Sequence, residues 1–230
     1  MSTLEFDELN EFQRYFLPMR ISDEQKKRRE QLANAIYDAM LFFFSAIRVY
    51  LKNGEYTREY FKKMLYNKLI DAVVEHTGTD DVLQTYLSEI ANDVADVTLG
   101  KFFFHFINPP VTGGIATQTE EDDEDTEDDM LKDNYWLSES RAFNIAVNET
   151  NTILNYSEYL EAIENGKTRK RWLTMKDERV RFTHFELDGA EIDIEDVFYV
   201  GESIMRYPRD FEYGASLNEI LGCRCSVEYF

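Results

Sequence analysis

The side chains best suited to chemistry lie toward the carboxyl end of the chain. Cys223 and Cys225 are the two cysteines of the protein, and His184 lies upstream in a polar segment that also holds Asp177 and Asp188. If the Cys-x-Cys segment forms a strand, both thiols point to the same face, because strand side chains alternate. Two thiols beside an imidazole and a carboxylate are a plausible zinc site. The candidate metal ligands are therefore His184, Cys223, Cys225 and Asp177, with Asp188 as another oxygen donor.

The same residues allow other interpretations. Cysteine behaves as a small apolar side chain, so both thiols could pack in the core while His184 hydrogen-bonds across a turn. A catalytic Cys–His pair would need surroundings that favour a thiolate, for which Arg224 is a slight indication. The sequence has no phosphate-binding glycine loop, His-Glu-x-x-His or Gly-x-Ser-x-Gly motif. We expect no catalytic residue and no enzyme activity, and no cofactor other than, at most, zinc.

Several basic residues lie just upstream of His184, although the chain as a whole has a formal charge of −20. Lys170, Arg171 and Arg179 could contact DNA phosphates. They could equally pair with neighbouring carboxylates, and so acidic a protein is a poor binder of nucleic acid through its overall field. Part of the negative charge is local, since nine carboxylates lie between Glu120 and Asp129.

The sequence favours a reduced, intracellular protein without a membrane partner. The N-terminus lacks the basic start and apolar run of an export signal. The longest apolar stretches, residues 39–47 and 102–107, are too short to span a bilayer. Two cysteines separated by one residue could hardly form an unstrained disulfide with each other.

Helical periodicity dominates the first half of the chain. Ser22 and Gln25 resemble a capping box, and apolar residues then recur at helical spacing. The pattern predicts helices over residues 22–53, from 58 to near 76, and 80–107, where Pro109-Pro110 stops the last one.

We expect three parts: a helical region over residues 1–107, an acidic flexible linker over 108–135, and a third domain over 136–230. Like charges at the density of the linker repel and cannot bury surface, although an acidic surface that docks a basic partner is the alternative. The third domain begins with a helix over about 141–164. Short strands are predicted after it, at 171–175, 190–194, 197–200 and 226–230. The fold class is α+β: a mainly helical N-terminal region, then a helix and a small α+β C-terminal domain.

A specific order of motifs runs through residues 138–230. It comprises a tryptophan, Asp-x-Arg-Val-Arg, a histidine, Leu-Asp-Gly, a proline-containing turn and Cys-Arg-Cys. This order resembles the phage head morphogenesis family, the minor capsid proteins similar to the F protein of phage Mu. Gly222 replaces the usual Asn before the first cysteine, and Val147-Asn148 replaces an Arg-Thr of the preceding helix. The matching residues, expected as a structural motif, include Trp172, Asp177, Arg179, Arg181, His184, Asp188, Gly189, Cys223, Arg224 and Cys225.

The resemblance implies a non-enzymatic minor head protein of the virion or procapsid, present in the host cytoplasm during assembly. It would associate with the portal vertex and act in head assembly and in DNA packaging or delivery. Its partners would be the portal protein and other capsid proteins, and phage DNA is a further candidate. The alternative is a DNA- or metal-binding factor that acts on the genome at the portal.

The motif residues would mainly hold the small domain together. Asp177 would pair with Arg179 or Arg181, and His184 would cap the Asp-Gly turn. The two thiols of the last strand would lie next to the turn that carries the imidazole.

Overall fold

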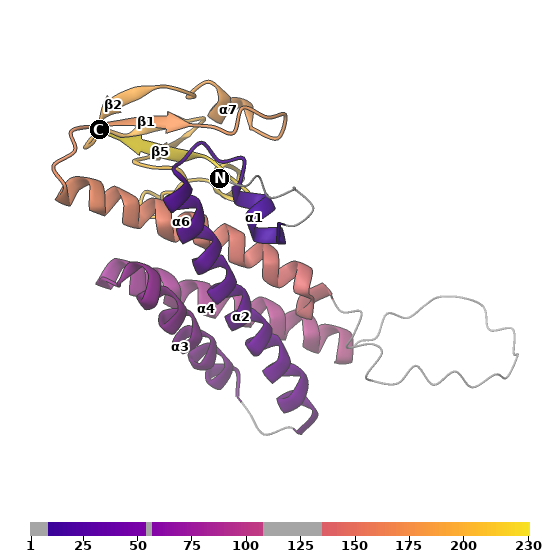
Figure 1. The fold of residues 1–230 in the computed structure, drawn as a ribbon. Helices are drawn as coiled ribbons and strands as arrows, with labels where there is room; N and C mark the ends of the chain where they lie inside the picture. Colours follow the sequence, from indigo (N-terminus) through magenta and orange to yellow (C-terminus); the bar gives the residue numbers. More distant parts are fainter. Residues whose placement is uncertain (1–8, 54–56, 108–134) are drawn as a thin grey trace, which may run out of the picture. The chain divides into compact units, whose positions relative to one another are not determined.

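The computed structural model of the protein describes residues 9–53, 57–107 and 135–230 (Figure 1). Its long helices and small antiparallel sheets confirm the predicted α+β class, with a helical N-terminal region. The predicted linker, 108–135, lies outside the described residues except for its last position. The chain groups into two compact units: residues 37–145, here the helical unit, and residues 1–36 with 146–230, here the sheet unit. The three-part division at 107 and 135 stays a prediction.

The long helices begin and end where the local signals place them. Gln25 and Ser22 exchange hydrogen bonds as a capping box, at 3.2 Å from Gln25 N to Ser22 Oγ and 3.0 Å from Ser22 N to Gln25 Oε1. Thr57 Oγ1 accepts from Tyr60 N, and Gly78 at φ +70° follows the next helix end. These signals bound α2 (Asp23–Asn53) and α3 (Arg58–Thr77), while α4 is Asp81–Ile107.

The helical unit buries apolar side chains from α3 and α4. Along α3 the buried positions are spaced four residues apart, at Phe61, Leu65, Leu69 and Val73, which is the stripe of a helix packed on one side. Phe43 of α2 meets Phe61 edge-on, with ring centroids 6.3 Å apart. The unit also contains the short helix η2 (Tyr135–Leu137) and the first turns of α6 (Glu139–Glu164).

The sheet unit is built on a three-stranded antiparallel sheet of order β2–β1–β5. In its register Trp172 of β1 lies opposite Val227 of β5. Trp172 is fully buried among Phe198, Val200, Met205 and the two cysteines. A separate hairpin, β3–β4, supplies part of this core. The strands are β1 (Arg169–Leu173), β2 (Glu191–Asp193), β3 (Phe198–Val200), β4 (Ser203–Met205) and β5 (Ser226–Tyr229).

The first residues of α2 and the second half of α6 also belong to the sheet unit. Arg29, fully buried, donates to Glu158 Oε1 at 2.6 Å and to Asn155 Oδ1 at 3.0 Å. Asn155 Nδ2 in turn donates to the carbonyl of Pro208 at 2.9 Å and to that of Cys225 at 3.4 Å. This chain of contacts fixes the segment before β5 against α6. A further short helix, α1 (Glu11–Phe16), precedes α2.

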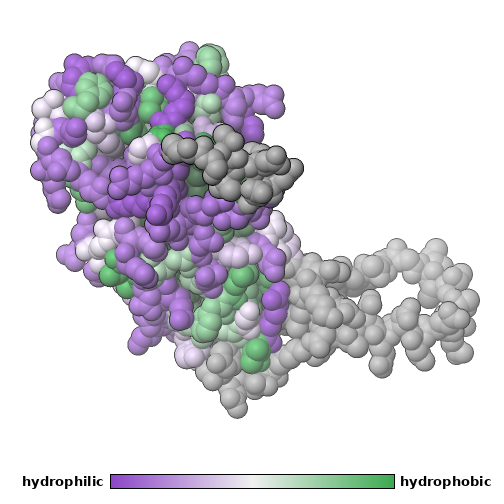
Figure 2. All heavy atoms as spheres, viewed as in Figure 1, coloured by the Kyte–Doolittle hydropathy of each residue, from purple (hydrophilic) through white to green (hydrophobic). Residues whose placement is uncertain are grey.

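One helix among the described residues, α2 over residues 23–49, has the length and composition that could cross a membrane. Buried core helices have the same properties, and the N-terminal turns of α2 carry the ion pair between Arg29 and Glu158. Over the strands, the face shown in Figure 2 is mainly hydrophilic, with scattered hydrophobic residues.

Candidate functional site

The thiols and the imidazole predicted to meet do meet. His184 lies on the short helix α7 (Phe182–Phe185) and is almost completely buried. Its Nδ1 is 3.4 Å from Cys225 Sγ and 3.5 Å from Cys223 Sγ. Both cysteines lie just before β5, whose bounds agree with the predicted strand over 226–230, so the thiols are not part of the strand itself. The segment between the turn at Gly222 and the start of β5 brings both sulfurs to one nitrogen.

Gly222 and Asn148 hold the turn that precedes the cysteines. Gly222 has φ +68°, in the left-handed region that glycine and asparagine tolerate best. Asn148 Oδ1 accepts from Gly222 N at 3.0 Å and from Arg209 Nη1 at 2.9 Å. Asn148 therefore anchors the turn from α6.

Glu219 completes the cluster and was missed by the sequence analysis. It lies on α8 (Leu217–Ile220), and its Oε2 is 2.9 Å from His184 Nε2. Thr183 Oγ1 donates to the same oxygen at 2.9 Å. No sequence motif pairs positions so far apart, and the only signal was a carboxylate close to the Cys-x-Cys segment.

The electrostatics of the cluster favour one thiolate beside a protonated imidazole. The hydrogen bond from the Cys225 thiol, aided by His184, lowers the pKa of Cys223 well below its usual value despite burial. The same hydrogen bond, together with burial, raises the pKa of Cys225. Burial opposes the charge on His184, but contacts with Cys223 and Glu219 outweigh it and raise the pKa of the imidazole. Such a cluster can stabilise the domain as a buried ion pair or ligate a soft cation.

Asp177, the predicted fourth metal ligand, has other partners. Its carboxylate forms an ion pair with Arg224 Nη2 at 2.8 Å and accepts from the backbone N–H of Arg179 at 3.1 Å. Its guanidinium partner is thus Arg224, whereas Arg179 or Arg181 was predicted. The guanidinium of Arg181 donates instead to the carbonyl of Leu221.

Asp188 stabilises the Leu-Asp-Gly turn, a role that was predicted for His184. Asp188 Oδ1 accepts from Thr174 N at 2.8 Å and Thr174 Oγ1 at 2.9 Å, and it pairs with Arg20 at 2.6 Å. Lys176 binds the other oxygen at 3.0 Å. Burial raises the pKa of Asp188, but these hydrogen bonds and charges outweigh it and lower the pKa to about 2. Gly189 follows at φ +82°, which only glycine adopts readily.

Trp172 packs its indole against the cluster. Its ring meets that of His184 edge-on, at 5.6 Å between centroids and 77° between planes. The tryptophan of the motif therefore packs directly against the imidazole.

The predicted DNA contacts need correction at Lys170. This side chain is fully buried, and its Nζ donates to the carbonyls of Ile194 at 2.7 Å and Asp196 at 2.6 Å. It cannot reach a phosphate. Arg171 is paired with Glu191 and Glu228, at 2.8 Å and 2.7 Å. Arg179 has an exposed side chain.

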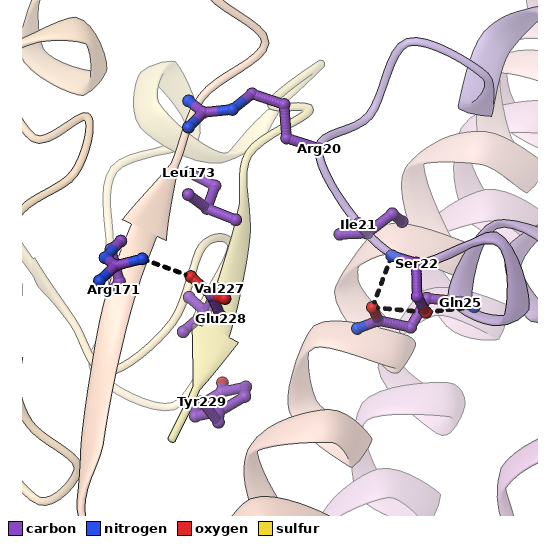
Figure 3. Close-up of a pocket in the computed structure, with 9 residues that line it drawn as sticks. All are labelled: Arg20, Ile21, Ser22, Gln25, Arg171, Leu173, Val227, Glu228 and Tyr229. Carbon is purple, nitrogen blue, oxygen red and sulfur yellow. Dashed lines mark hydrogen bonds and ion pairs between the residues drawn. The ribbon is translucent and has the colours of Figure 1, made fainter.

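A hollow of about 560 Å³ lies between the start of α2 and strands β1 and β5 (Figure 3). Its charged lining residues have partners already: Arg171 binds Glu228, and Arg20 binds Asp188. The hollow thus does not gather a set of unpaired catalytic groups.

Comparison with known proteins agrees with the motif. The family model described as "Phage Mu protein F like protein" matches residues 114–228. The NAD(+)--arginine ADP-ribosyltransferase EFV of Enterococcus faecalis is 33% identical over 102 residues, which are 40% of this chain and 20% of the relative. This chain thus spans about a fifth of that relative's length. No solved structure matches the chain.

Proposed function

Because this chain belongs to the Phage Mu protein F-like family, we propose that it is a minor head protein that binds the portal vertex and acts in DNA packaging or delivery. The family assigns it to phage head morphogenesis, and so to the virion or procapsid. The proposal adds three points: contact with the portal protein, presence in the host cytoplasm during assembly, and action in DNA packaging or delivery.

The observation that carries the proposal is a set of four exposed apolar side chains on α7, on α8 and at the residue after α8, here called the apolar patch: Phe182, Phe185, Leu217 and Leu221. Their exposed fractions are 73%, 58%, 67% and 54%. The two helices are joined at Glu219, which binds side chains of α7. Large apolar side chains grouped on a surface mark protein contact sites. The patch therefore supports docking on a neighbouring head protein, with the portal protein as the partner that we propose.

We propose that the protein is not an enzyme. Its cysteines are buried, and the carboxylates of the motif are paired with basic side chains. The printed name of the Enterococcus relative describes an ADP-ribosyltransferase, but the shared segment is only a fifth of that protein. Incubation with NAD+ and an arginine-bearing acceptor should therefore release no nicotinamide, and nicotinamide release by the wild type but not by an unfolded sample would contradict this view.

The alternative of DNA contact has less support. Lys170 is buried and Arg171 is held between two carboxylates, so among the three proposed contacts only Arg179 has an exposed side chain. Retention on DNA–agarose at low salt that disappears in Arg179→Gln would favour the alternative.

Co-expression with the portal protein of the same phage, followed by size-exclusion chromatography with mass measurement, tests the proposal. The wild type should co-elute with the portal ring. The double variant Phe182→Ser/Leu217→Ser should lose co-elution while keeping its circular dichroism spectrum. A matched control is Val74→Ser/Val97→Ser, which replaces exposed side chains of α3 and α4 and should still co-elute. Wild-type protein that never co-elutes, or a patch variant that binds as well as the wild type, would overturn the proposed docking.

A further inference from the structure

In the sheet unit, one nitrogen and two sulfur atoms that could ligate a metal ion lie close together. His184 Nδ1 and the sulfurs of Cys223 and Cys225 lie within 4.8 Å of one another, and all three residues are buried. The imidazole comes from α7 and the sulfurs come from the turn before β5. We propose that these three atoms bind one zinc ion, which cross-links the two segments.

The distances fit this geometry. In a tetrahedral site with Zn–S near 2.3 Å and Zn–N near 2.1 Å, a nitrogen and a sulfur ligand lie roughly 3.6 Å apart. The Nδ1–Sγ distances here are 3.4 Å to Cys225 and 3.5 Å to Cys223. Both nitrogen–sulfur distances therefore match a tetrahedral site, and the two sulfurs lie within 4.8 Å of each other.

Glu219 sets the imidazole in the form that a metal requires. A carboxylate accepts hydrogen bonds, so the 2.9 Å contact with Glu219 Oε2 places a proton on His184 Nε2. In the neutral imidazole, the lone pair of Nδ1 then points at the two sulfurs. Carboxylate contacts of this kind orient histidine ligands in metal sites. Thr183 donates to the same oxygen and keeps Glu219 in place. Glu219 is therefore a positioning residue and not a ligand.

The surroundings stabilise thiolates. The backbone N–H of Cys225 donates to Cys223 Sγ at 3.5 Å, a contact that favours the charged sulfur. Arg181 and Arg224 line the cavity beside the cluster and add positive charge. Binding of zinc displaces any protons on the two sulfurs and on His184 Nδ1 to solvent, so that two thiolates and a neutral imidazole face the ion.

The fourth position opens into a small cavity. This space of about 10 Å³ is lined by the three ligands together with Met175, Val180, Gly222 and basic side chains. A cavity of roughly 10–15 Å³ holds one water molecule, which would complete the tetrahedron. Asp177, the oxygen ligand predicted from the sequence, does not line this cavity and is paired with Arg224. The set of two thiolates and one imidazole selects zinc over magnesium or calcium.

Metal analysis of the full chain tests the inference. After purification, or after refolding with excess zinc and gel filtration, the wild type should hold about one zinc per chain. Cobalt in place of zinc should give the thiolate-to-cobalt absorption in the near ultraviolet and the visible bands of a tetrahedral site. A folded wild-type protein that retains almost no zinc, and whose cobalt sample lacks both bands, would overturn the inference.

Variants separate ligation from a purely structural role. Cys223→Ser/Cys225→Ser should lose the zinc, but it could fail to fold. Glu219→Gln keeps all three ligands and should weaken zinc affinity by about 10–100-fold in competition with a chelator. Asp177→Asn is the matched control and should bind zinc as the wild type does. Equal affinity in Glu219→Gln and wild type would contradict the positioning role of Glu219, and loss of zinc in folded Asp177→Asn would contradict the assigned ligand set. These readouts do not depend on portal binding, so failure here leaves the proposed function standing.

Discussion

Nε2 of His184 lies 2.9 Å from Oε2 of Glu219, and this contact ties α7 to α8. Because the other nitrogen of the same ring meets both cysteine sulfurs, a single imidazole connects α7, α8 and the segment before β5. The residues of the apolar patch belong to the two short helices that this imidazole joins and to Leu221, which directly follows α8. The buried motif residues thus shape the surface that we propose for docking.

Replacing both cysteines should destabilise the sheet unit. Cys223→Ser/Cys225→Ser replaces two buried sulfurs with smaller, more polar hydroxyls, which contact the imidazole and the core less well. The free energy of unfolding should fall by about 2–4 kcal/mol. Urea unfolding should be followed by tryptophan fluorescence in a Trp136→Phe background, where Trp172 alone reports. Cys223→Ala/Cys225→Ala should cost less, because it leaves no buried hydroxyl. An unchanged midpoint in the serine variant would show that the thiols do not stabilise this unit.

The buried pair of Arg29 and Glu158 should matter far more than the neighbouring exposed pair. Glu158→Ala leaves a fully buried guanidinium without its carboxylate and should cost about 3–5 kcal/mol. Glu161→Ala removes an exposed partner of Arg28 and should cost less than about 1 kcal/mol. Chemical denaturation of both variants checks the contrast, and similar midpoints would show that the Arg29 pair is not the one that stabilises the unit.

Asp188 should make the sheet unit sensitive to acid. Its pKa is lowered to about 2 in the folded protein, so the unfolded chain binds the proton more readily. The contribution of Asp188, roughly 2 kcal/mol, is present above pH 4 and is lost as the pH falls toward 2. Asp188→Asn should lower stability at neutral pH and flatten the acid slope. Asp193→Asn, at an exposed carboxylate, is the control. Equal acid slopes in Asp188→Asn and wild type would contradict this assignment.

Lys170 should also make stability rise with pH, but at alkaline pH. Burial, with the charge of Arg206, lowers the pKa of Lys170 to about 8. Between this value and the ordinary lysine pKa the unfolded chain holds more protons, so stability rises with pH, by about 3 kcal/mol at most. Below pH 8 both states are protonated and the dependence disappears. Urea midpoints measured from pH 7.5 to 10 should rise in the wild type and stay flatter in Lys170→Met. Equal pH slopes in the two proteins would show that burial does not destabilise the charge of Lys170.

The sequence predicts the long helices well because their signals are local. Ser22 with Gln25, Thr57 and Gly78 mark helix ends through contacts within a few residues, and the structure places the ends there. Of the five strands in the described part of the chain, four are also predicted, within one or two residues. The short helices α1, α7 and α8 are missed, since four to six residues are too few to show a helical period, and the strand β4 is missed as well.

The candidate site is predicted in part. The motif order indicates that His184 meets the two cysteines, and the structure agrees. Glu219 is missed because its partnership with His184 exists only after α7 and α8 have folded together. The predicted role of Asp177 changes because Arg224, one residue from each cysteine, captures its carboxylate. The sequence shows that Asp177 has several possible basic partners nearby. Which of them it pairs with depends on the folded backbone.

The central claim, that this chain is a minor component of phage heads, is tested most directly by counting it. Quantitative mass spectrometry of purified procapsids and virions from the phage that encodes it should find the chain in both, in far fewer copies than the major capsid protein. Its absence from procapsids and virions alike, in an infection that yields the soluble protein, would contradict the claim.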